Sequence, residues 1–172
     1  MVKVFVLNNK KKYINSIKEN IKNIELNILS KDDIDKISEE ISIDKNNKLY
    51  FDYLRLYIIF KNGGLILDGN FEIKESLNLF FNNNLFFGYK TENQLCTNIV
   101  FVKEKENKYL KQILNIIEQD KFSDITEVIS QVVNKDLANI YNSLVNFNNE
   151  LIIYPYDYFR HVYPIYKYCP IS

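Results

Sequence analysis

The chain has 172 residues, a length typical of one domain with a substantial core. Hydrophobic residues make up 47% and charged residues 26%, which is typical of a globular protein, and 22 basic residues balance 22 acidic ones. A net charge of zero excludes an overall basic field, so we expect no nucleic-acid partner. No apolar run approaches the roughly 20 residues of a membrane-spanning helix, so we expect no transmembrane segment.

The first part of the chain alternates between strand and helix patterns. Residues 2–7 are apolar and rich in β-branched side chains, as in a buried strand, and residues 24–29 form a second such run. Residues 10–22 carry isoleucines at helical spacing, and Ser30 is a candidate N-cap for a helix over residues 31–40. This order of elements predicts a parallel sheet of the doubly wound kind.

The middle of the chain combines the clearest helix pattern with a central strand. Residues 45–61 place apolar side chains three and four positions apart, and the Asn-Gly-Gly of residues 62–64 ends that helix. Residues 65–67 are apolar without alternation, which favours a strand covered on both faces. Asp68 follows this strand, and open α/β sheets bind ligands at the carboxyl ends of their parallel strands.

We expect the whole chain, residues 1–172, to form a single small α/β domain with a mostly parallel mixed sheet flanked by helices. The tail, residues 155–172, has no regular period, and we expect either an ordered loop over the sheet end or a segment cut from something longer. The remaining elements expected are strands over 85–89, 97–102 and 150–154 and helices over 76–81, 106–119, 123–133 and 135–145.

Two charged side chains on the expected central helix are candidates for ligand binding. Asp52 and Arg55 lie three residues apart and therefore share a helix face. Arginine offers a fork of donors to a phosphate or to sugar hydroxyls, and aspartate accepts hydrogen bonds from hydroxyls. The spacing alone fits a simple ion pair on a helix equally well. Asp68 is likewise either a ligand for a divalent cation or the cap of a turn.

Residues 50–73 resemble the sugar-binding DXD glycosyltransferases, which include capsular polysaccharide transferases, initiating mannosyltransferases and the glucosyltransferase domains of clostridial toxins. The similarity lies in FDYLR at 51–55, in YIIF at 57–60 and in GGLILDGN at 63–70. Their order and spacing follow the family pattern of an acid, an arginine, a Gly-Gly pair and an Asp-x-Asp motif. A looser similarity extends over residues 85–118.

The resemblance implies a Rossmann-like GT-A fold and the retaining transfer of a sugar from a nucleotide sugar, often UDP-linked. The acceptor is left open between a glycan, a lipid-linked and a protein acceptor. A divalent cation, Mn²⁺ or Mg²⁺, would offset charge on the departing diphosphate. The donor-binding residues so implied are Asp52, Arg55, Asp68, Asn98 and Asn8, and the metal ligands are Asp68 and Asn70.

The sequence departs from the family pattern at several positions. Asn70 stands where the second acid of the Asp-x-Asp motif is usual, and an uncharged amide oxygen should weaken metal affinity. Ile66 replaces a usual tyrosine, and the C-terminal His/Trp tail is reduced to a lone His161. The alternative is therefore a catalytically degenerate glycosyltransferase-like protein that binds nucleotide sugars or another partner. Two cysteines without metal or disulfide spacing fit a cytoplasmic location, with attachment to the inner face of the membrane left open.

Overall fold

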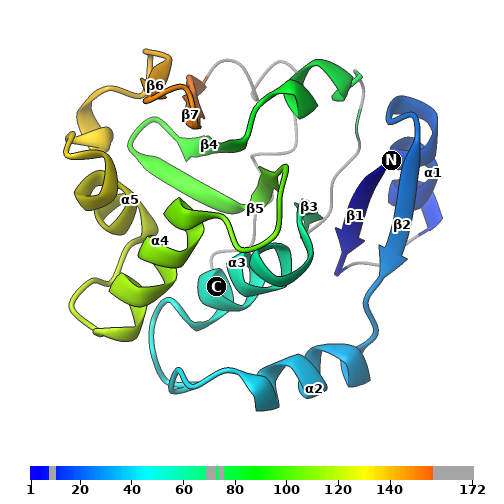
Figure 1. The fold of residues 1–172 in the computed structure, drawn as a ribbon, viewed down its shortest axis with the longest axis horizontal. Coiled ribbons are helices and arrows are strands. Elements are labelled where there is room, and N and C mark those ends of the chain that lie inside the picture. The colour runs from blue at the N-terminus through cyan, green and yellow to red at the C-terminus, as the bar shows by residue number, and fades with distance from the viewer. Residues whose placement is uncertain (8–10, 69–72, 74–75, 157–172) are drawn as a thin grey trace.

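In the computed structural model, the chain forms a seven-stranded mixed sheet with helices packed on both of its faces (Figure 1). The structure describes residues 1–7, 11–68, 73 and 76–156. The strands are β1 (Val2–Val6), β2 (Ile24–Ile28), β3 (Gly64–Leu67), β4 (Leu85–Thr91), β5 (Gln94–Val102), β6 (Val145–Phe147) and β7 (Leu151–Tyr154). The helices are α1 (Lys11–Asn20), α2 (Lys31–Glu40), α3 (Tyr50–Asn62), α4 (Lys108–Glu118) and α5 (Ile125–Val133).

The strand order across the sheet is β2-β1-β3-β5-β4-β7-β6. Strand β1 pairs in parallel with β2 and β3, and β4 pairs in parallel with β7. Strand β5 runs antiparallel to both of its neighbours, and β6 runs antiparallel to β7. Five of the seven strands in the described part of the chain therefore share one direction, which confirms the predicted α/β class with a mixed, mostly parallel sheet.

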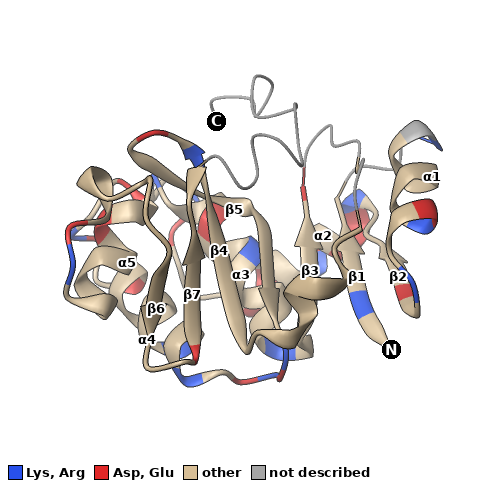
Figure 2. Ribbon diagram, turned by 90° about the horizontal axis from the view of Figure 1, so that it is seen from above, with Lys and Arg blue, Asp and Glu red and all other residues tan. Residues whose placement is uncertain are grey.

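Strand β3 lies in the centre of the sheet, and its side chains are buried on both faces, as its unbroken apolar sequence predicts. Leu65 and Leu67 pack in a cluster with isoleucines of α1. Ile66 points to the opposite face and packs in a larger cluster with α3, α4 and α5. Figure 2 shows that charged residues lie mainly on the helices and loops around the sheet rather than on its central strands.

Gly64 allows β3 to start directly beside β1. Its φ angle is +103°, which glycine adopts readily, and a Cβ atom there would lie 2.3 Å from the carbonyl oxygen of Lys3. Gly63 also has a positive φ, and its N–H donates to Ile59 O as α3 ends. The Gly-Gly pair thus ends the helix and sets the position of the strand that leads to Asp68.

Side-chain caps mark the N-termini of α2, α4 and α5. Ser30 forms the predicted N-cap of α2 in a capping box with Asp33. Helix α3 begins at Tyr50, later than the predicted residue 45, because aspartate and asparagine side chains in the preceding segment accept backbone N–H groups and form turns there. The predicted helix over 76–81 is a 3₁₀ helix, Asn78–Asn82.

The predicted helix over residues 135–145 is wrong. Asn134 adopts a left-handed conformation with φ 52° and ends α5, and only a 3₁₀ turn at Leu137–Asn139 follows. Residues Val145–Phe147 instead form β6, which pairs with β7. Long-range strand pairing therefore overrides the local pattern. None of the helices in the described part of the chain combines the length and apolar character needed to cross a bilayer.

Candidate functional site

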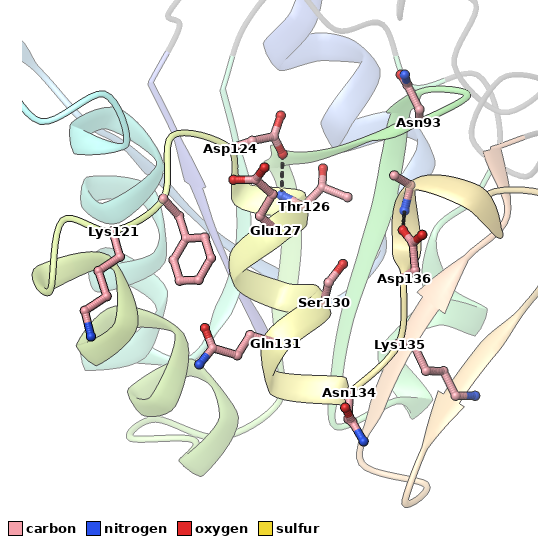
Figure 3. Close-up of a pocket in the computed structure, with 12 residues that line it drawn as sticks. Asn93, Lys121, Asp124, Thr126, Glu127, Ser130, Gln131, Asn134, Lys135 and Asp136 are labelled. Carbon is pink, nitrogen blue, oxygen red and sulfur yellow. Dashed lines mark hydrogen bonds between the residues drawn. The ribbon is translucent and has the colours of Figure 1, made fainter.

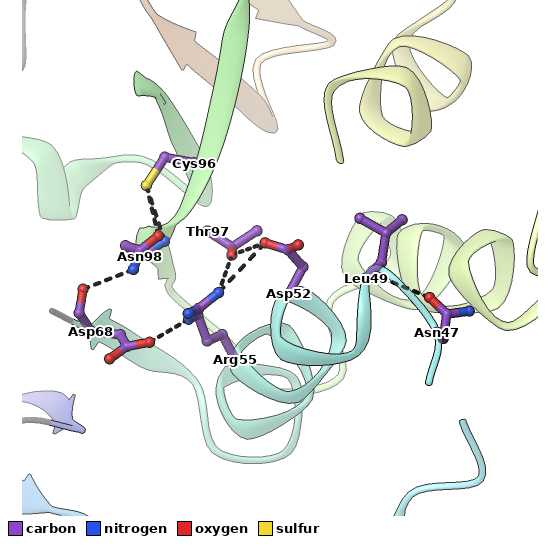
Figure 4. A network of polar contacts seen from close by, with 8 residues as sticks. All are labelled: Asn47, Leu49, Asp52, Arg55, Asp68, Cys96, Thr97 and Asn98. Atoms are coloured by element: carbon purple, nitrogen blue, oxygen red, sulfur yellow. Dashed lines mark hydrogen bonds and ion pairs between the residues drawn. The ribbon is translucent and has the colours of Figure 1, made fainter. Parts of the chain in front are cut away.

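Three of the predicted site residues meet at the carboxyl end of β3 (Figure 4). Helix α3 presents Asp52 and Arg55 on one face, and Asp68 directly follows the strand. Arg55 Nε donates to Asp68 Oδ2 at 2.6 Å, and Arg55 Nη1 lies 3.6 Å from Asp52 Oδ1. The guanidinium group thus lies between two carboxylates from two different elements.

A fourth member of this network, Thr97, was not predicted. It lies on β5 with 1% of its surface exposed, and its hydroxyl donates to Asp52 Oδ1. The hydroxyl oxygen of Thr97 in turn accepts a hydrogen bond from Arg55 Nη1 at 3.3 Å. Because β5 runs antiparallel to β3, the first half of β5 lies beside the carboxyl end of β3. The available signal in the sequence was a threonine directly before Asn98, at the start of an apolar run.

Asn98 lies next to the network, and its described contacts are with the protein itself. Its Nδ2 donates to Asp68 O at 3.0 Å, and Asp68 N donates to Asn98 O at 2.9 Å. Its Oδ1 accepts from Cys96 Sγ at 3.2 Å. Asn98 therefore holds the backbone at Asp68 in place. Its predicted contact with a donor sugar stays a prediction.

The network is only partly accessible to solvent, and this changes the chemistry of Asp52. The side chains of Arg55, Asp68 and Asp52 are 12%, 21% and 24% exposed. Burial raises the pKa of Asp52, although the hydrogen bond from Thr97 and the charge of Arg55 act in the opposite direction. The negative charge of Asp124 adds to the increase. A carboxyl group whose pKa is shifted by burial and by specific charged partners is more frequent at functional sites than elsewhere.

A cavity of about 330 Å³ opens beside Asp52 and Arg55, and we call it the Arg55 pocket. Thr97 and Asn98 also line it, together with Lys48, Lys90 and Asp124 from neighbouring segments. Asp68 does not line it, because Arg55 lies between Asp68 and the cavity. The three predicted residues are thus in contact, but they do not all face one cavity.

The described residues provide only part of a metal site. They contain no group of three or more His, Cys, Asp or Glu side chains that could hold a metal ion. Asp68 Oδ2 accepts from Arg55, while Oδ1 accepts no hydrogen bond from the described part of the chain. Mg²⁺ is often bound by one or two carboxylates together with substrate phosphates and water. Asp68 therefore fits such a site only in combination with a phosphate ligand.

Some predicted residues lie outside the described ranges. Asn8 and Asn70, predicted to bind the donor and the metal, are among them, and so is His161. The outcome for the described residues is mixed. Asp52, Arg55, Asp68 and Asn98 lie together at the carboxyl end of β3, but Asp68 does not line the pocket, and their role in donor binding stays a prediction. Thr97, Lys90 and Asp124 join the site without having been predicted.

The same contacts also contribute to the fold. The ion pair of Arg55 with Asp68 connects α3 to the end of β3, and the hydrogen bond from Thr97 to Asp52 connects α3 to β5. An ion-pair network in this position can serve packing alone.

Comparisons with protein-family models, with curated proteins and with solved structures find no match to this chain.

Proposed function

We propose that this chain is a glycosyltransferase that binds a nucleotide sugar at the Arg55 pocket and transfers the sugar with retention. The observation that carries the proposal is the meeting of Asp52, Arg55 and Asp68 at the carboxyl end of a central strand, beside a cavity. The similarity of residues 50–73 to the DXD glycosyltransferases supports the same conclusion. A cytoplasmic location is part of this proposal.

In this proposal, Arg55 is the main phosphate ligand. A guanidinium group has five N–H donors, and the contacts with Asp68 and Thr97 use only some of them. Lys48 and Lys90 line the same pocket and add positive charge for a diphosphate. Asp52 lines the pocket as a carboxylate that can accept hydrogen bonds from sugar hydroxyls.

A divalent cation enters the proposal together with the diphosphate. Asp68 would supply one carboxylate oxygen and Asn70 a neutral amide oxygen, so the protein alone should hold the ion weakly. Bound with the diphosphate, Mn²⁺ or Mg²⁺ would offset the charge of the leaving nucleotide. The expected signature is cooperative binding of metal and nucleotide sugar.

Titration calorimetry with UDP-glucose, UDP-N-acetylglucosamine and GDP-mannose, each with and without Mn²⁺, tests this function. We expect Mn²⁺ to strengthen the binding of at least one donor and Asp68→Ala to abolish that effect. Asp35→Ala, which removes an exposed acid on α2, is the matched control and should behave as the wild type. If Asp68→Ala binds donor and metal as well as the wild type, the site is misassigned.

One observation favours a second candidate, a nucleotide-sugar-binding protein without turnover. Arg55 Nε lies 2.6 Å from Asp68 Oδ2, so a fixed cation already neutralises the carboxylate that would hold the metal. In that case donor binding should be independent of Mn²⁺, and no UDP should be released on prolonged incubation. Metal-stimulated release of UDP would exclude this candidate.

A further inference from the structure

Three adjacent hollows surround the segment that joins α4 to α5. The first is the Arg55 pocket, and the second has a volume of about 420 Å³ and lies between this segment and the one that precedes α3. The third, of about 820 Å³, runs along α5 (Figure 3). Lys48 and Ser123 line the first and second hollows, Phe122 and Glu127 line the second and third, and Asp124 lines the first and third.

We call the second and third hollows together the α5 groove, and its chemistry is that of a surface for hydroxyl groups. Glu127 and Gln131 lie four residues apart and therefore share one face of α5, and Asn134, which ends the helix, lines the same hollow. Their side chains make no hydrogen bond with the described residues. A carboxylate can accept hydrogen bonds from sugar hydroxyls, and an amide group can both donate to them and accept from them.

An aromatic ring lies where the second and third hollows meet. Phe122 is half-buried, and it packs against the hydrophobic cluster beneath the sheet while it lines both hollows. The groove that it lines also carries polar side chains along α5, among them Glu127, Ser130 and Gln131 (Figure 3). An apolar ring bordered by hydrogen-bonding groups suits a sugar, whose C–H faces are apolar and whose edges carry hydroxyls.

The charge of the groove argues against an anionic ligand. Its lining includes more carboxylates than lysines, so a polyanion such as a nucleic acid or a phosphorylated polymer would be repelled. A neutral, polyhydroxylated chain does not meet this repulsion. The carboxylates are Asp44, Asp120, Asp124, Glu127 and Asp136, and the lysines are Lys48, Lys121 and Lys135.

We propose that the α5 groove binds a neutral glycan chain as the acceptor. This inference rests on the proposed function, because an acceptor must reach the sugar of a donor held in the Arg55 pocket. The groove and the Arg55 pocket adjoin at Asp124, which lines both hollows. The side chain of Asp124 accepts a hydrogen bond from Gln94 Nε2 at 2.8 Å. Hollows of about 420 Å³ and 820 Å³ offer more room than a single sugar fills, which suits a chain of several sugars.

The test is an NMR titration of the ¹⁵N-labelled full chain with maltohexaose, cellohexaose and chitohexaose, without nucleotide. We expect at least one hexasaccharide to shift amide signals of residues 121–136. Gln131→Ala removes an amide group, and Phe122→Leu keeps an apolar side chain but removes the ring. Each should weaken binding about fivefold, as the loss of one modest contact does.

Gln112→Ala, on the exposed side of α4 and away from the groove, is the matched control and should leave the affinity unchanged. The absence of shifts with all three glycans, or shifts confined to other parts of the chain, would overturn the inference. Binding of an oligolysine peptide in place of the glycans would also overturn it and would assign the groove to a basic partner.

A parallel titration with UDP-glucose and Mn²⁺ separates this inference from the proposed function, because it reports on amide signals of Arg55, Thr97 and Asn98. If the glycan shifts amide signals along α5 and UDP-glucose with Mn²⁺ shifts those around Arg55, both proposals are supported. Glycan shifts without any donor response would keep the groove as a glycan site but overturn its role as the acceptor site. Donor shifts without glycan shifts would leave the proposed function standing and remove the groove from it.

Discussion

Two ion pairs of nearly equal length occupy opposite environments in this molecule. Arg55 Nε and Asp68 Oδ2 are 2.6 Å apart, and Lys108 Nζ and Glu150 Oε2 are 2.8 Å apart. The side chains of the first pair are 12% and 21% exposed, whereas those of the second are 61% and 37% exposed. A similar distance between charged atoms therefore does not mean a similar contribution to stability. Water screens the exposed Lys108–Glu150 pair strongly and the Arg55–Asp68 pair much less.

The two ion pairs also differ in the other residues that they contact. The Arg55–Asp68 pair belongs to a network with Asp52 and Thr97 that connects one helix with two strands beside a cavity. The Lys108–Glu150 pair joins the first turn of α4 to the residue before β7 at the surface. The first pair therefore lies in a more shielded site with more fixed partners, although both pairs border a hollow in the surface.

The largest effect is expected from Arg55→Met, which removes the shared partner of two carboxylates. Leaving a largely buried charge unpaired should lower the free energy of unfolding by about 3 kcal/mol. The variant should also lose nucleotide-sugar binding. Urea unfolding and calorimetry measure the two effects separately.

Arg55→Lys is the companion variant, because it keeps the positive charge but loses the planar fork. It should recover part of the stability and little of the donor affinity. If Arg55→Met unfolds at the same urea concentration as the wild type, the buried pair stabilises the fold no more than a surface pair does. The proposed distinction between the two pairs would then be wrong.

A smaller, pH-dependent effect is expected from Asp52→Asn. Because the folded-state pKa of Asp52 is raised above 3.8, the folded protein binds its proton more readily than the unfolded chain does. The charged carboxylate therefore destabilises the fold increasingly as the pH rises from 3.8 to the folded-state value, and fully above it. Asparagine removes this cost, so the variant should gain stability relative to the wild type as the pH increases.

Urea unfolding at about pH 3.5 and at about pH 7 measures the Asp52 effect. Asp35→Asn, at an exposed acid on α2, controls for general effects of pH on the protein. A relative stability that moves in the opposite direction would show that Arg55 and Thr97 outweigh burial at Asp52. The carboxylate would then stabilise the fold in the same way as an ordinary ion pair.

The smallest effect is expected from Lys108→Met. The pair with Glu150 is exposed, so its loss should change the thermal unfolding midpoint by no more than the measurement error. Donor binding should also be unchanged, because neither residue lines the Arg55 pocket. A destabilisation comparable to that of Arg55→Met would contradict the distinction between the two pairs.

Local signals in the sequence predicted much of the fold correctly. The capping box at Ser30, the apolar run of β3 and the helical spacing in α3 each depend on interactions within a few residues. The error at residues 135–145 has a different origin. Its strand β6 depends on pairing with β7, and that pairing leaves no local pattern in the sequence, whereas the end of α5 before Asn134 matches the predicted boundary.

Helical period and strand hydrophobicity are local properties, so they suffice to predict that Asp52 and Arg55 share a helix face and that Asp68 follows a central strand. The presence of Thr97, Lys90 and Asp124 beside them depends on the tertiary fold. The antiparallel course of β5 carries Thr97 to the carboxyl end of β3, and the start of α5 carries Asp124 to the same pocket. Such neighbours are set by pairing between distant segments, which no short-range pattern in the chain encodes.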